Sequence, residues 1–387
     1  MVVCRHIKLA FTLFLVSSSL FIRAQMTEIQ LINNPLPLNS DSNKLYLKIL
    51  NANFVKDNEY FNQIVEGYTL SGYWITPSIE YHPGAKSTLE AGMHLLKFSG
   101  RDRYFKILPV FTFSQQLCPN ILLILGTLNS NNNHQMPEPL ADPERFYFKQ
   151  VDNGIQFLID NKRIKSDIWF TCDSFIWRGD TTQEQFTSGT SSEFVMINNS
   201  GWSVSLPVQT IITHKGGQIN RPKKTIETLM NLGTGLNIEF NNESGFIKRI
   251  RLNPHFFIYN KSTSSDFPES PYKKGWALYP NILINSNHLY LKLAWYHSNS
   301  FIGPRGEAIY QSVSTEPIDQ SFLKLDTTKN EKYRNLFIGK IAFSKTLGKG
   351  ITINAGFEGY YDTHEKLFDY NFSFHLLYSG KFLMHIF

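Results

Sequence analysis

A strict alternation of apolar and polar side chains at the end of the chain constrains its fold more than any other feature. From Phe368 to Ile386, ten consecutive even positions read Phe, Tyr, Phe, Phe, Leu, Tyr, Gly, Phe, Met and Ile, while most odd positions are polar. Successive side chains of a β-strand point to opposite faces, so this segment is predicted to be a strand with one apolar face. Strands of soluble proteins usually have about 5–6 residues, whereas a tilted membrane-spanning strand needs about 9–11. The length favours a membrane strand.

The same period of two recurs along the chain, most clearly on the segments 73–81, 89–95, 168–176, 230–240, 289–295 and 351–361. On two of these segments the second face consists largely of glycine and small polar residues, which cannot form a dry core and suit the polar interior of a barrel. The pattern gives sixteen candidate strands: 44–55, 67–81, 88–98, 104–115, 120–128, 145–159, 166–177, 193–198, 202–213, 227–241, 246–260, 275–286, 288–298, 333–346, 350–360 and 367–387.

The connections between these segments alternate between short and long. Turn-rich breaks such as Asn241–Gly245 and Leu347–Gly350 alternate with longer polar stretches such as Asn129–Glu144 and Ser298–Lys332. Tight periplasmic turns and larger outer loops are typical of up-and-down membrane barrels. We therefore predict an all-β, transmembrane, up-and-down antiparallel barrel of about 14–16 strands. The segment Ser298–Lys332 is expected to be its longest and least ordered outer loop.

The N-terminus reads as an export signal. Arg5 and Lys8 precede an apolar run of 14 residues, Leu9 to Ile22, which is shorter than the roughly 20 residues of a membrane helix. Residues 1–25 are therefore predicted to be a signal peptide, with an uncleaved anchor helix as the alternative. We expect a periplasmic N-terminal segment over residues 26–43 and the barrel over residues 44–387.

Composition excludes several other classes of protein. Charged residues make up 18% of the chain and aromatic residues 14%, whereas typical soluble domains have about 25% charged residues. Low charge and high aromatic content argue against disorder, a coiled coil and a nucleic-acid partner. Cys118 and Cys172 follow the predicted signal peptide and lie far apart, so we expect neither a disulfide framework nor a metal site, and no cofactor.

Taken together, these features resemble Gram-negative outer-membrane β-barrels of the porin-like kind. The aromatic C-terminus, Phe387, is the feature that the barrel-assembly machinery of that class recognises, although Phe387 itself is out of step with the apolar even face. The resemblance implies export to the outer membrane, contact with its lipid, and passive passage of small hydrophilic solutes. It leads us to predict a channel and not an enzyme. The oligomeric state is left open.

The polar faces of the candidate strands supply residues that could contact a solute in the lumen. Arg249, Arg251 and His255 share one face of one strand. The full predicted set is Arg249, Arg251, His255, Lys292, Lys340, Asp167, Trp169, Asp173, Glu239 and Glu358. In a closed barrel the same charges would instead pair with one another, because buried charges need partners.

An alternative function comes from the run Tyr296-His297-Ser298-Asn299. It resembles the His-x-Ser-Asn run of outer-membrane phospholipases and lipid A deacylases, in which a histidine activates a serine two residues away. Here His297 and Ser298 are adjacent and so lie on opposite faces, whereas Ser300 shares the face of His297. A lipid-modifying enzyme would use His297, Ser300 and an acid such as Glu307. The same residues could simply form a polar strand end.

Two further interpretations remain open. The loop around His134 and Glu138 could hold a metal ion, but an Asn-rich loop of this kind is predicted to be solvated. The barrel could also be a plugged structural barrel that assembles with another envelope complex.

Overall fold

The computed structural model describes residues 42–129, 133–180, 182–218, 225–242, 244–264, 271–315 and 325–387. These residues form a closed antiparallel barrel, because the first strand, β1, pairs with the last strand, β19. The sheet has 17 strand segments. Two of them, β10 and β11, are parts of one strand, since both pair with β9 and β12, so the barrel has sixteen strands. The predicted signal peptide lies outside the described residues.

The strands follow one another around the barrel in chain order. The barrel strands are β1 (Lys44–Glu59), β2 (Tyr68–Gly84), β3 (Ser87–Phe98), β4 (Lys106–Cys118), β5 (Ile121–Thr127), β6 (Asn153–Asp160), β7 (Ile164–Ser174), β8 (Gln185–Asn198), β9 (Trp202–Lys215), β10 (Glu227–Gly235), β11 (Asn237–Asn241), β12 (Arg249–Thr263), β13 (Lys274–Asn285), β14 (Leu289–Asn299), β17 (Tyr333–Gly348), β18 (Ile351–Asp362) and β19 (Leu367–Ile386). The short strands β15 (Val313–Thr315) and β16 (Leu325–Asn330) form a separate hairpin. The helix α2 (Arg145–Phe148) lies between β5 and β6.

The predicted fold class and the upper predicted strand number are confirmed. Two predicted strands differ from the observed ones by eight residues at one end. Residues 145–148 form α2 instead of the start of a strand, and β6 begins only at Asn153. Strand β8 begins at Gln185, eight residues before the predicted 193. Its first half, Gln185–Ser192, is rich in Ser, Thr and Gly and so lacks the apolar alternation that the prediction used, but it pairs fully with β7 and β9.

The faces of β19 follow the predicted register. Even-numbered side chains such as Phe372 and Phe374 are largely exposed on the outer face, and Phe374 keeps 49% of its surface accessible. Asp369, Asn371 and His375, on the odd face, are buried inside. An apolar outer face and a polar inner face are what a barrel in lipid requires. In the described part of the chain, no helix is both long enough and apolar enough to cross a membrane.

A pair of substitutions tests this register. We expect Phe374→Arg to impair assembly, because a cation on the lipid face near the midplane costs about 2–4 kcal/mol. Ser373→Arg, one residue away on the inner face, should be tolerated better. The folded fraction in outer membranes, read from heat-modifiable mobility on gels, measures both. Equal tolerance of the two variants would contradict the register.

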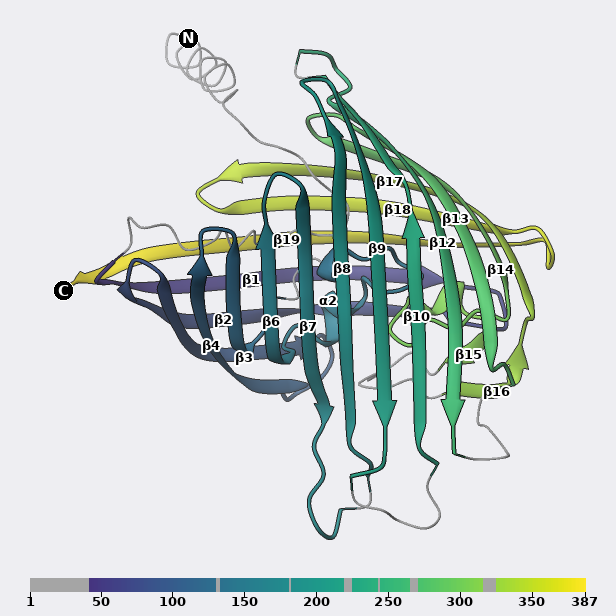
Figure 1. Ribbon diagram of the computed structural model, residues 1–387, viewed down its shortest axis with the longest axis horizontal. Helices are drawn as coiled ribbons and strands as arrows, with labels where there is room; N and C mark the ends of the chain where they lie inside the picture. Colours follow the sequence, from purple (N-terminus) through teal and green to yellow (C-terminus); the bar gives the residue numbers. More distant parts are fainter. Residues whose placement is uncertain are drawn as a thin grey trace, which may run out of the picture.

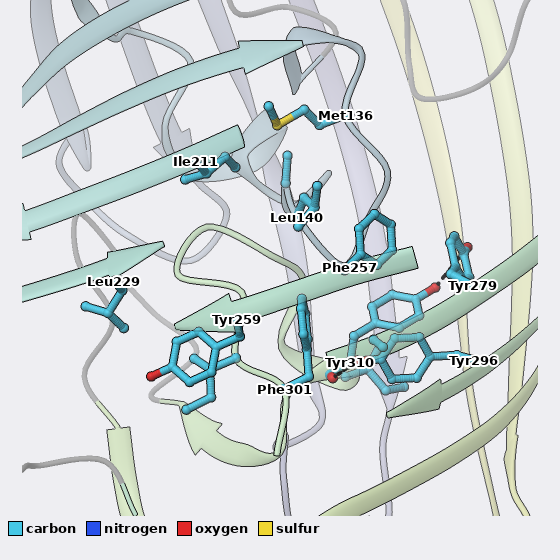
Figure 2. Close-up of a cluster of buried hydrophobic side chains, with 14 of the residues drawn as sticks. Met136, Leu140, Ile211, Leu229, Phe257, Tyr259, Tyr279, Tyr296, Phe301 and Tyr310 are labelled. Atoms are coloured by element: carbon cyan, nitrogen blue, oxygen red, sulfur yellow. Dashed lines mark hydrogen bonds between the residues drawn. The ribbon is translucent and has the colours of Figure 1, made fainter. Parts of the chain in front are cut away.

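Two long connections fold into the barrel and fill part of its lumen. We call residues 133–152 and 300–315 the plug. Figure 1 shows β8 to β12 running down the picture and β17 to β19 running across it, with α2 near the centre of the view. Leu140, Phe301 and Tyr310 of the plug are fully buried, and they pack against inward side chains such as Phe257 and Tyr279. Figure 2 shows this cluster.

This packing corrects the prediction for Ser298–Lys332. The segment is the long connection between β14 and β17, but its described first half is not a loosely ordered outer loop. Phe301, Ile302 and Ile309 are apolar, and folding into the lumen removes them from water. The asparagine of β10, Asn231, donates a hydrogen bond of 2.9 Å to the carbonyl of Ile302 and helps to hold the segment inside.

Candidate functional site

Charged side chains of the plug pair with charges on the barrel wall. Glu138 accepts hydrogen bonds from Lys292 of β14, at 2.6 Å, and from the hydroxyl of Tyr279, and it lies 3.1 Å from Lys340 of β17. Burial disfavours the charged form of Glu138, but the two lysines more than offset this and hold its pKa well below the usual range. Glu138 is therefore a carboxylate that ties the plug to two strands.

A second group of ion pairs anchors the two parts of the plug to each other and to β7. Arg305 lies 3.0 Å from Asp173 of β7 and 3.3 Å from Asp152. Arg145 and Lys149 also pair with Asp152, at 2.5 and 3.6 Å. Each of these carboxylates is shared by more than one cation. This sharing fixes α2 and the loop around Arg305 in one arrangement.

Glu307 differs from these carboxylates because no cation among the described residues forms an ion pair with it. Its side chain is only 4% exposed. Its Oε1 lies 3.4 Å from the hydroxyl of Tyr360 on β18, and its Oε2 has no hydrogen-bond partner among the described residues. The Tyr360 hydroxyl also donates to Glu358 at 2.5 Å, so its single proton cannot serve both carboxyl groups.

Two other carboxyl groups approach Glu307 around a small cavity. The cavity has a volume of about 10 Å³ and is lined by Tyr60, Tyr68, Asp142, Glu144 and Glu307. A volume of about 10–15 Å³ holds one water molecule. Glu144 is neutralised by Lys56 of β1, whose Nζ donates a hydrogen bond to it at 2.5 Å.

Burial controls the protonation of this group. It raises the pKa of Glu307 to about 8, and Lys340 offsets this only in part. Burial also raises the pKa of Asp142 to about 6, against the hydrogen bond that its carboxylate accepts from the backbone N–H of Glu144. It raises the pKa of Tyr60 well above its usual value, so that hydroxyl keeps its proton. A carboxyl group that titrates close to neutral pH, next to room for one water, can act as a general base.

The raised pKa of Glu307 predicts a stability effect. A carboxyl with a folded-state pKa of about 8 and an ordinary value of 4.5 contributes stability that is complete below 4.5 and lost as the pH rises through about 8. The raised pKa of Asp142 acts in the same way at lower pH, because its contribution to stability is lost as the pH rises through about 6. We therefore expect the free energy of unfolding to fall as the pH rises from about 4.5 to about 8, and Glu307→Gln to remove the part of the fall between about 6 and 8. Urea unfolding in lipid vesicles at a series of pH values checks this, and an unchanged slope in the variant would contradict it.

The ten predicted lumen residues all carry their side chains on the inner face, where their charges are paired. Arg249 and Arg251 pair with Glu239, and His134 pairs with Asp167 at 2.8 Å. The remaining predicted lumen residues, His255, Lys292, Lys340, Trp169, Asp173 and Glu358, are buried or half-buried inside the barrel. Their contact with a solute stays a prediction.

The three residues of the enzymatic alternative are not brought together. His297 lies on the outer face of β14, between the rings of Trp276 and Trp295, whose centroids are 5.5 and 5.7 Å away. The alternation ends there, because Ser300 has a positive φ of 54° that turns the chain into the lumen. The hydroxyl of Ser300 donates to Asn299, and Glu307 lies inside the barrel. Of the three residues, only Glu307 belongs to the carboxyl group described above.

The loop around His134 also differs from the prediction of a solvated loop. The His134 ring is buried and stacks on Trp169 with a centroid distance of 3.7 Å, while Glu138 faces the two lysines. In the described part of the chain, no cluster of three or more His, Cys, Asp or Glu residues could hold a metal ion.

Sequence analysis missed Lys56, Tyr60, Asp142 and Glu144 as members of the site. The sequence does contain a signal that the two long connections of the plug are buried. The stretches Phe146-Tyr147-Phe148 and Ala308-Ile309-Tyr310 are apolar and aromatic within long connections, which indicates burial.

A closed sixteen-stranded barrel with an apolar outer face defines this chain as an outer-membrane β-barrel, and its lumen holds an internal plug. The family model described as lipid A 3'-O-deacylase-type matches residues 38–387, so the chain belongs to that family. The prediction that the chain is not an enzyme is wrong, because the family is named for an enzymatic reaction. A search of the curated proteins finds no match to the chain.

Solved structures with a similar architecture include three outer-membrane proteins. OmpT of Vibrio cholerae with its loop L8 deleted has 8% identity and a TM-score of 0.49, covering 87% of this chain and 98% of that chain. OccAB4 of Acinetobacter baumannii has 10% identity and a TM-score of 0.47, covering 89% and 100%. OprD of Pseudomonas aeruginosa has 8% identity and a TM-score of 0.46, covering 94% and 99%. With TM-scores below 0.5, these similarities contribute nothing to the assignment of function.

Proposed function

We propose that this barrel is an outer-membrane hydrolase that releases an ester-linked acyl chain from lipid A. Membership of the lipid A 3'-O-deacylase-type family supports the reaction class. Within the structure, the proposal rests on one observation: the buried carboxyl of Glu307, whose Oε2 has no hydrogen-bond partner among the described residues, lies beside a cavity for one water molecule. Such a carboxyl can accept a proton from water close to neutral pH.

The proposed reaction is a hydrolysis in which the Glu307 carboxylate acts as general base. It takes a proton from the water in the cavity while the water oxygen bonds to the acyl carbon. The hydroxyl of Tyr60, which burial keeps protonated, donates a hydrogen bond to the developing oxyanion. When the ester bond breaks, the proton held by Glu307 passes to the leaving sugar oxygen. The products are a fatty acid and a free hydroxyl on lipid A.

The connection between β1 and β2 gives the proposed route for the acyl chain. It is held at the rim by Asn62, which donates to Asp369 of β19 at 2.9 Å, and by the N–H of Phe61, which donates to the same carboxylate at 2.6 Å. Phe61 is 59% exposed. Tyr60 and Val65 of this connection line the small cavity beside Glu307. We therefore propose that the acyl chain enters past their neighbour Phe61.

Fatty-acid release from purified lipid A tests the proposal. The refolded protein in detergent should release fatty acid from lipid A, and release should be much slower from a phospholipid of equal chain length. Heat-unfolded protein is the control. Equal rates on both lipids would contradict the specificity for lipid A, and no release by correctly folded protein would contradict hydrolysis altogether.

The channel function stays a prediction. The plug fills part of the lumen with packed aromatic side chains, which does not favour free passage of solutes. Planar-bilayer recording of the refolded protein checks this directly. We expect little or no conductance. A large steady conductance would favour the channel function, with the predicted lumen residues as its lining.

A further inference from the structure

A second, larger cavity lies beside α2. It has a volume of about 120 Å³ and is bordered by α2 and by the inner face of β14, β17, β18 and β19. One water needs about 10–15 Å³ of such space, so this cavity has room for a small organic molecule. Glu307 does not line it.

The wall of this cavity contains a recess of small residues. Ala342, Gly356 and Ser373 are neighbours on β17, β18 and β19 and form its floor. A side-chain atom added at Gly356 would lie 3.1 Å from the Ser373 hydroxyl, which is a close contact, and 3.9 Å from both the Ala342 side chain and the carbonyl oxygen of Ile341. A larger side chain at Gly356 would therefore occupy the recess and press on Ser373.

The cavity reaches into the periplasmic halves of β14 and β18. Tyr290 is the second residue of β14 and Asn354 the fourth residue of β18, each counted from a short turn. Short turns lie on the periplasmic side in barrels of this kind. These two lining residues therefore lie nearer the periplasmic side, whereas Lys56, the thirteenth residue of β1, lies towards the outer end of its strand.

Cations outnumber acids around the cavity. Lys56, Arg145, Lys149 and Lys340 line it, against only Glu138 and Glu358. The acid partners of Arg145 and Lys149 are Asp152 and Asp173, which lie behind them, outside the lining. Burial and the neighbouring Arg145 lower the pKa of Lys149, against the two carboxylates that pair with it.

Apolar and unpaired polar atoms complete the surface. Phe146 and Tyr147 of α2 are among the residues that line the cavity. Asn354 is 3% exposed, and its side-chain oxygen has no hydrogen-bond partner among the described residues. Buried polar atoms in folded proteins are normally satisfied, so an unpaired one in a cavity wall points to a ligand or to water.

We infer that this cavity is a binding site for a small organic anion, separate from the proposed site of hydrolysis. The carboxylate of the anion faces Arg145 and Lys149, its carbon skeleton packs on Phe146 and Tyr147, and its remaining polar group reaches Asn354. An aromatic carboxylate matches both the charge and the apolar surface.

Calorimetric titration of the refolded full chain with benzoate tests this inference. Benzamide, which has nearly the same shape and no charge, is the control ligand. We expect benzoate to bind at least about 10-fold more tightly than benzamide, since one charge-assisted hydrogen bond is worth roughly that factor. Equal affinities, or no binding of benzoate, would overturn the inference.

Matched variants locate the binding. Gly356→Leu should abolish benzoate binding by filling the recess, whereas Gly339→Leu, on the outer face of β17, should not. Lys149→Gln should weaken binding about 10-fold, while Lys345→Gln, exposed on the outer face, should leave it unchanged.

Binding that survives both Gly356→Leu and Lys149→Gln would place benzoate elsewhere and overturn the assignment. The Glu307→Gln variant should bind benzoate as the wild type does. A failure of the proposed hydrolysis is therefore distinguishable from a failure of the proposed anion binding.

Discussion

Glu307→Gln is expected to reduce the release of fatty acid from lipid A by at least about 100-fold, since general-base catalysis contributes roughly 10²–10⁴-fold. Glutamine keeps the shape of the side chain but cannot accept the proton of water. Folding should be retained, because Glu307 makes no ion pair that the substitution would break. Initial rates on purified lipid A measure the effect.

The pH dependence gives this prediction a second readout. The carboxylate is the active form, and burial places the pKa of Glu307 at about 8. The wild-type rate should therefore rise with pH and level off above about 8. A matched control is Glu365→Gln, an exposed residue of the turn between β18 and β19, which should change neither rate nor profile. A Glu307→Gln variant with wild-type activity would remove Glu307 from the mechanism.

The largest expected loss of stability comes from Glu138→Ala. Lys292 and Lys340 face each other as paired residues of β14 and β17, and Glu138 lies between their ammonium groups. Removing one partner of a buried ion pair costs about 3–5 kcal/mol, because the remaining charges stay buried and uncompensated. Urea unfolding of the barrel in lipid vesicles measures the change.

The control for this prediction is Glu365→Ala, which removes an exposed carboxylate and should alter stability by no more than about 0.5 kcal/mol. The double variant Lys292→Met with Glu138→Leu should recover part of the loss, since it replaces a charged contact by an apolar one. A cost for Glu138→Ala below about 1 kcal/mol, in the range of a surface pair, would show that Glu138 does not anchor the plug.

The barrel could be predicted from the sequence because its signal is local. Alternation on β19 and on β10 assigns inner and outer faces residue by residue, and the exposed Met230 and buried Asn231 follow that assignment. Where the apolar and polar residues do not alternate, the predicted strand was too short, as in the Ser- and Thr-rich first half of β8. Likewise, Arg145–Phe148 carries aromatic residues that suit a strand, but it forms α2 within the plug.

The candidate site could not be predicted in the same way, because its contacts join distant parts of the chain. Lys292 and Glu138 are 154 positions apart, and Lys56 and Glu144 are 88 apart. No spacing rule connects such residues before the loops are known to fold inward. His297 was selected for its neighbours in sequence, whereas the turn at Ser300 separates it from Glu307.

The mass of lipid A extracted from cells tests the central claim most directly. The full chain is produced in a Gram-negative host whose lipid A carries all its ester-linked acyl chains, and extracts are compared with those from cells producing Glu307→Gln at the same folded level. We predict that the wild type yields lipid A lighter by one ester-linked acyl chain and that the variant yields the unmodified lipid. Unmodified lipid A in cells that hold the folded wild-type barrel in the outer membrane would contradict the account.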